Sequence, residues 1–144
     1  MPFFLVRMEN TTPLSTPDSR PVSALSLRIS NICHAYGDVY IAVYDSEKNF
    51  LQPDKAVFVQ VVPVRSKGAL TVEVPLALPG HYAFSCYHDL NENGRLDTRL
   101  MGIPTEPYGF SNAARPKFRA PRWEEAKCYC TASAPSVELS LDTW

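Results

Sequence analysis

The sequence lacks the long apolar run that a membrane-spanning helix needs. Such a helix takes about 20 apolar residues, whereas the longest apolar stretch, KAVFVQVVPV, is interrupted by Gln60 and Pro63. The first residues, MPFFLVRMENTTPLSTP, also lack the basic start and the extended apolar centre of a signal peptide. We therefore predict that no segment inserts into a membrane and that the chain carries no export signal.

Neither sign of charge is in excess. The formal net charge is -1, from 14 basic and 15 acidic residues. Nucleic acids and anionic membranes bind to surfaces on which basic residues gather. This balance excludes a broad cationic surface, and nucleic acid is not an expected partner.

Cysteine is scarce, with four residues in 144, which is too few for a disulfide-dense scaffold. Cys128 and Cys130 are two positions apart, so on a strand they share a face and are badly placed to bond to each other. We interpret the cysteines as small core residues in preference to a metal-binding CxC pair. A disulfide between Cys86 and Cys128 or Cys130 is left open, and Cys33 is expected to be independent of them.

Alternating apolar and polar residues are the main structural pattern. They occur in LSLRIS, LTVEV and VELSLD, and β-branched or aromatic runs lie between them in DVYIAVYD, AVFVQVVPV, HYAFSCYH and AKCYCTA. No long amphipathic helix pattern separates these runs. Strands with one apolar face need a second layer to cover it. The sequence therefore predicts an all-β fold, an antiparallel β-sandwich of about seven strands in an immunoglobulin-like Greek key.

Two regions depart from the strand pattern. Residues 1–21 are rich in Pro, Ser and Thr, which predicts a flexible leader before a single sandwich domain at 22–144. The segment 89–125 shows no convincing strand, yet it holds Phe118, Trp123 and other large apolar residues. A solvated linker does not carry so many. We expect this segment to pack on the sandwich as a long ordered loop lobe.

The stretch HDLNENGRLDT has the spacing of a cation-binding loop. Oxygens recur at alternate positions, Gly94 allows a sharp turn, and calcium requires six to eight such oxygens around one point. Leu100 stands where an EF-hand loop has its bidentate Glu, so a downstream carboxylate must complete the site. The predicted calcium ligands are the side chains of Asp89, Asn91, Asn93, Asp97 and Glu106 and the carbonyl of Arg95.

The alternative is a polar turn in which Asn93 and Gly94 form the bend and the neighbouring side chains cap backbone amides. We favour the cation, because a simple turn does not require oxygens at alternate positions or Asp97. Calcium is preferred to magnesium, since carbonyl and carboxamide oxygens in a flexible loop suit the larger ion.

Three motifs, PGHYA, HDLNENGRLD and GIPTEPYGFSNAA, resemble those of the bacterial domain-of-unknown-function family 2141. Members of that family carry runs of the form PGxYA, HDxNxNGxLD and GxPxExYGFSNNA, and Ala113 stands where they have a second Asn. The resemblance extends over roughly residues 22–142. It implies a small prealbumin-like β-sandwich, generally in secreted or periplasmic proteins, with no established activity.

Two classes of function compete. The first is a non-enzymatic binding module in which a lobe, residues 102–123, presents contact residues to an unknown protein or glycan. These contact residues are Tyr108, Phe110, Asn112 and Trp123.

The second class is a hydrolase using Asp89, Asp97 and Glu106, because glycosidases use two carboxylates. We favour the binding module, because a polar, Asn-rich loop does not raise the pKa of one carboxyl as acid catalysis needs. No nucleophile elbow, phosphate-binding glycine loop or zinc spacing is present in the sequence.

Overall fold

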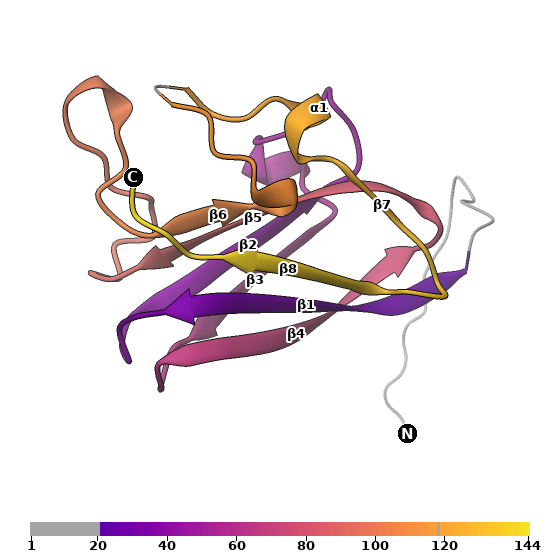
Figure 1. The fold of residues 1–144 in the computed structure, drawn as a ribbon, viewed down its shortest axis with the longest axis horizontal. Coiled ribbons are helices and arrows are strands. Elements are labelled where there is room, and N and C mark those ends of the chain that lie inside the picture. Colours follow the sequence, from indigo (N-terminus) through magenta and orange to yellow (C-terminus); the bar gives the residue numbers. More distant parts are fainter. Residues whose placement is uncertain (1–20, 118) are drawn as a thin grey trace.

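A computed structural model describes residues 21–117 and 119–144, which form two packed β-sheets (Figure 1). The predicted leader, apart from its last residue, lies outside the described residues. The all-β sandwich is confirmed, with one strand more than expected. The strands are β1 (Val22–Ile32), β2 (Asp38–Tyr44), β3 (Phe58–Pro63), β4 (Gly68–Ala77), β5 (Gly80–Asp89), β6 (Tyr108–Phe110), β7 (Cys128–Cys130) and β8 (Ser136–Ser140).

One sheet has the strand order β4-β1-β8, and the other has the order β3-β2-β5-β6, with β7 paired to the start of β5. All strand pairs are antiparallel except β1 with β8, which run parallel. The parallel pair arises because the chain crosses from β7 to the other sheet before β8 begins (Figure 1). This pair is the exception in an otherwise antiparallel sandwich.

The main core lies between the two sheets. Leu25, Leu27 and Ile29 of β1 alternate inward and are fully buried, as the period-two pattern predicts. On β5 the inward side chains include Phe84, Cys86 and His88. The Nε2 atom of His88 donates a 2.6 Å hydrogen bond to the Tyr36 carbonyl.

A second, smaller core covers the outer face of the five-stranded sheet. It contains Tyr44, Ala83, Trp123 and Ala126, with Phe50 packed against it. The short helix α1 (Trp123–Ala126) supplies two of these residues. The strand β5 is consequently covered on both faces near its start, which the alternation of its sequence does not reveal.

The described part of the segment 89–125, which leaves out Phe118, is ordered, but it is not free of strands. Its residues Tyr108–Phe110 form β6, in which Tyr108 pairs with Tyr87 and Phe110 with Ser85. Our expectation of no strand was wrong here because β6 has only three residues and Gly109 at its centre. A Cβ atom on Gly109 would lie 2.3 Å from the Ser140 carbonyl oxygen, so the close approach of β8 requires glycine at this position. In the sequence, however, a glycine within a strand usually indicates that the strand is weakened or interrupted.

Three short 3-10 helices complete the described secondary structure: η2 (Pro53–Lys55), η3 (Leu100–Gly102) and η4 (Ser111–Ala113). Within residues 21–117 and 119–144, no helix reaches the length and apolar character that crossing a membrane requires.

The four cysteines differ in exposure, and all are free thiols. Cys86 and Cys130 are buried, Cys128 is half-buried and Cys33 is exposed. Burial raises the pKa of Cys86 to about 12, although Arg115 and a backbone hydrogen bond from Gly109 partly oppose it. Cys86 therefore stays protonated at neutral pH.

We expect a thiol reagent to modify Cys33 first and to spare Cys86 until the protein unfolds, because only an accessible thiolate reacts. Mass spectrometry of peptides after timed labelling, with and without denaturant, measures the order. Fast modification of all four thiols in the folded protein would contradict the buried positions.

Candidate functional site

The loop that follows β5 is folded around the carboxylate of Asp89. This side chain is fully buried, and its two oxygens accept backbone hydrogen bonds from Asn93 at 3.2 Å and Gly94 at 2.7 Å. Gly94 has a φ of +81°, a conformation that glycine adopts without strain. Asp89 thus brings the middle of the loop back to the end of the strand.

Asp97 gathers the two asparagine side chains. Its oxygens accept hydrogen bonds from Nδ2 of Asn91 at 2.6 Å and from Nδ2 of Asn93 at 2.7 Å. These two bonds, Asn93 first, lower the pKa of Asp97, with a smaller contribution from Arg95. Four of the predicted ligand side chains therefore lie in one compact loop. Within it, the Oδ1 atom of Asn91 accepts a hydrogen bond from the Asn93 amide, and the Oδ1 atom of Asn93 accepts one from the Arg95 amide.

Glu106 joins the two ends of this loop. Its Oε2 atom accepts from the Leu90 amide at 2.8 Å, and its Oε1 atom accepts from the Asp97 amide at 2.9 Å. The side chain is only 5% exposed. The amide and hydroxyl of Thr105 also donate to the Asp97 carbonyl. The downstream carboxylate named from the sequence therefore lies against the loop.

Three carboxylates thus lie close together with little positive charge beside them. Among ion pairs of the described residues, only Arg95 reaches this cluster, with its Nε atom 3.6 Å from Asp97 and its side chain 80% exposed. The pKa of Tyr87 is raised to about 12, chiefly by burial, then by Tyr40, and further by the charges of Asp89, Glu106 and Asp97. The loop is a centre of negative potential.

No three residues among the His, Cys, Asp and Glu of the described chain are placed to hold a metal ion together. A cation at this loop would therefore depend on amide and backbone oxygens in addition to carboxylates. Such a mixed set of oxygens suits calcium better than zinc.

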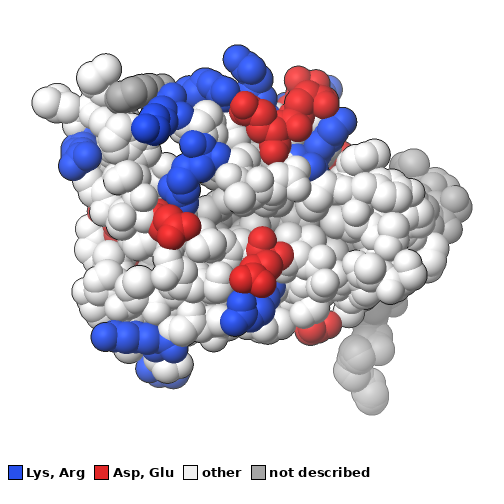
Figure 2. Space-filling model, viewed as in Figure 1, with Lys and Arg blue, Asp and Glu red and all other residues white. Residues whose placement is uncertain are grey.

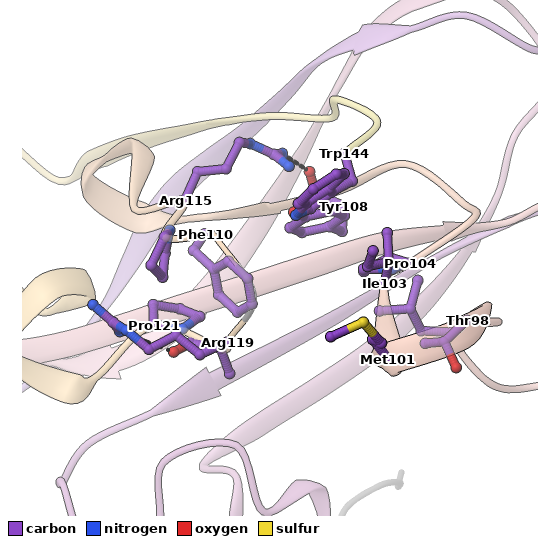
Figure 3. A pocket seen from close by; sticks show the side chains of 14 residues that line it. Thr98, Met101, Ile103, Pro104, Tyr108, Phe110, Arg115, Arg119, Pro121 and Trp144 are labelled. Carbon is purple, nitrogen blue, oxygen red and sulfur yellow. Dashed lines mark hydrogen bonds between the residues drawn. The ribbon is translucent and has the colours of Figure 1, made fainter.

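Beside the loop, the lobe encloses a small cavity that we call the lobe pocket, with a volume of about 230 Å³ (Figure 3). Leu96 and Thr98, the neighbours of Asp97, form part of one wall with Met101 and Ile103. Phe110, Arg119 and Pro121 come from the opposite side, and Tyr108 and Trp144 lie at one end (Figure 3). The wall of the cavity is therefore formed in part by the sequence neighbours of Asp97, at the end of the candidate cation loop (residues 89–97).

A second depression, the sheet groove, lies on the outer face of the five-stranded sheet and has a volume of about 560 Å³. Tyr40 and Tyr87 stack in it, with ring centroids 5.0 Å apart and an interplanar angle of 6°. Leu96, Tyr108 and Phe110 line both this groove and the lobe pocket. The two depressions thus share walls.

The four predicted contact residues take different positions. Tyr108 and the half-buried Phe110 line the lobe pocket. Asn112 is exposed, and its Nδ2 atom donates to the carbonyls of Glu125 and Lys127, so it holds the lobe to α1. Trp123 is only 8% exposed and belongs to the second core, which gives no support to its predicted role as a contact residue.

Two residues at the lobe pocket were not identified from the sequence. The Arg115 guanidinium lies 4.0 Å from the centre of the Tyr108 ring and donates to the Tyr108 carbonyl. Trp144 reaches the pocket from the end of the chain. Neither belongs to a recognisable motif, and Trp144 is far from the lobe in sequence, so only the fold reveals them.

Charges on the face shown in Figure 2 are mixed. Basic and acidic groups lie side by side there, with no continuous basic field. Two of the pairs near α1 are ion pairs, Arg119 with Glu125 at 2.8 Å and Lys127 with Glu124 at 2.9 Å. This view agrees with the balanced composition and gives no support to a nucleic-acid interface.

Comparison with known proteins places the chain in a family. A family model described as "Uncharacterized protein conserved in bacteria (DUF2141)" matches residues 27–138. No curated protein and no solved structure matches the chain significantly. The matched residues include most of both sheets, the candidate cation loop and the lobe. The chain therefore belongs to the bacterial family DUF2141 of uncharacterized proteins.

Proposed function

We propose that this protein is a non-enzymatic binding module in which a calcium ion at residues 89–97 anchors the lobe. The lobe then presents its pocket, and the sheet groove beside it, to a glycan or a protein segment. The observation that carries this proposal is the attachment of the lobe pocket to the loop through Leu96 and Thr98.

The uncompensated negative charge at the loop supports the proposal that a cation binds there. Asp89 and Glu106 are buried carboxylates, and burying a charge is costly unless a partner of opposite sign or several hydrogen bonds offset it. Each of these two carboxylates receives two backbone hydrogen bonds, yet neither is paired with a basic side chain among the described residues. A divalent cation supplies the missing positive charge.

The asparagines support the same site. The Nδ2 atoms of Asn91 and Asn93 both contact Asp97. A half rotation of each carboxamide exchanges its nitrogen and oxygen. It turns two neutral oxygens toward the Asp97 carboxylate and releases the hydrogen bonds that these oxygens accept from the Asn93 and Arg95 amides. Calcium accepts such a mixture of carboxylate and carboxamide oxygens.

The hydrolase alternative has less support. A pair of catalytic carboxylates faces a cleft that holds the substrate. Asp89, Asp97 and Glu106 instead accept hydrogen bonds from their own loop, and none of them lines the lobe pocket or the sheet groove. We therefore base the proposal on binding.

Calcium is expected to raise the melting temperature of the protein, because it binds the folded loop and not the unfolded chain. At a hundred times the dissociation constant, the stabilisation is about 2.7 kcal/mol. We expect Asp89→Ala to abolish the calcium-dependent rise while the strands still form. Differential scanning calorimetry and isothermal titration calorimetry measure both effects.

Asp54→Asn is the matched control, because Asp54 is exposed and belongs to η2, outside residues 89–97. It is expected to keep the full rise. The polar-turn interpretation prevails if millimolar calcium gives neither heat nor a thermal shift, or if Asp89→Ala keeps the rise.

The binding half of the proposal is tested by screening the calcium-loaded protein against glycan and peptide arrays. A ligand of the lobe pocket is expected to lose most of its affinity in Phe110→Ala and to bind Leu100→Ala normally, since Leu100 is 87% exposed and does not line the pocket. Equal binding by both variants would place the ligand elsewhere.

A further inference from the structure

The two cysteines of β7 bring their sulfur atoms into contact. Both side chains point to the same face of the strand, and the Sγ atoms of Cys128 and Cys130 are 3.9 Å apart. The sequence alone indicates that such a pair is badly placed for a disulfide, and both thiols are free. Cys130 is 3% exposed within the main core, and the half-buried Cys128 is hydrogen-bonded to the Tyr82 carbonyl at 3.3 Å.

We propose that Cys128 and Cys130 together bind one soft monovalent cation, copper(I), between their sulfurs. Both thiols lose a proton to solvent, two copper–sulfur bonds form, and copper keeps its oxidation state. Sulfur ligands of this kind select soft ions such as copper(I) and disfavour calcium. The site is therefore independent of the oxygen-lined loop and of the proposed binding function.

The number of available ligands decides between copper and zinc. Structural zinc takes four protein ligands, but the described residues place no third His, Cys, Asp or Glu with this pair. Cys86 lies farther along β5, beside Gly109, whereas Cys128 pairs with Tyr82. Two thiolates alone satisfy copper(I), which is stable with two sulfur ligands.

The separation of the sulfurs suits a bridging ion. A zinc–thiolate bond is about 2.3 Å long, and two metal–sulfur bonds of that length span at most about 4.6 Å, so sulfurs 3.9 Å apart can both reach one ion between them. The buried position of Cys130 restricts access by water and by further ligands.

The Sγ atoms contact each other, and either thiol can donate the hydrogen bond between them. Copper(I) would take the place of the two protons that the thiols release, because the thiolate is the form that binds a metal.

The test is a competition between the reduced, full-length protein and bicinchoninate for copper(I), in the absence of oxygen and with ascorbate present. One copper(I) per chain is expected to transfer to the protein. Cys33→Ser should bind as the wild type does, since Cys33 is exposed and distant in sequence. Loss of an outer-shell partner alone costs a metal site 10–100-fold in affinity, so we expect Cys128→Ala and Cys130→Ala each to weaken binding more than about 100-fold.

Circular dichroism and thermal melting of each variant separate a lost ligand from a lost fold, because Cys130 is a core residue. X-ray absorption of the copper-loaded wild type gives a second measure that needs no variant, with two sulfur neighbours expected. The proposal is overturned if the wild type takes up no copper, if Cys33→Ser loses it, if a folded Cys128→Ala variant keeps it, or if the spectrum shows other than two sulfurs.

Discussion

Trp123→Ala is expected to lower the free energy of unfolding by about 3–5 kcal/mol, the usual cost of removing a large buried aromatic side chain. Trp123 is 8% exposed and packs with Tyr44, Ala83 and Ala126 in the second core. Its ring meets Phe50 edge to face, with centroids 5.9 Å apart. The truncation leaves a cavity between α1 and β5 that these neighbours cannot fill.

Urea denaturation followed by circular dichroism measures this loss. Leu100→Ala serves as the control, because Leu100 is 87% exposed and such surface changes stay within about 0.5 kcal/mol. A cost below about 1 kcal/mol for Trp123→Ala would restore Trp123 to the list of candidate contact residues.

Ser111→Ala is expected to cost about 2–4 kcal/mol, because it leaves two buried backbone groups without their partner. The Ser111 hydroxyl is fully buried. It accepts a 2.9 Å hydrogen bond from the Phe84 amide of β5 and donates a 2.5 Å bond to the Ala126 carbonyl of α1. This single side chain therefore links the central sheet to the helix that carries Trp123.

The same denaturation experiment measures the effect, with Ser66→Ala as the matched control at an exposed position. Hydrogen exchange adds a local measurement, since the Phe84 amide should exchange much faster in Ser111→Ala. Unchanged stability together with unchanged protection of that amide would show that the serine bridge is dispensable.

Much of the sandwich follows from local patterns. The inward residues of β1, β4 and β5 alternate in the sequence as they do in the core, because successive side chains on a strand point to opposite faces. The spacing from Asp89 to Asp97 likewise places four polar side chains in one loop, since neighbours in sequence must be neighbours in space. That these oxygens bind calcium stays a prediction.

Other features depend on segments that are distant along the chain. The strand β6 exists because Gly109 allows β8 to approach, and Glu106 reaches the loop because β6 lies beside β5. No local pattern encodes such pairings, which arise only when separate strands compete to bury their apolar faces.

The sequence by itself determined the all-β class, the inward faces of the main strands and the polar loop with its resemblance to family 2141. The tertiary structure alone decided that Trp123 is a core residue and that Trp144 lines the lobe pocket. The reason is physical. Alternation and spacing act over a few residues, whereas the burial of an aromatic ring depends on which other elements pack against it.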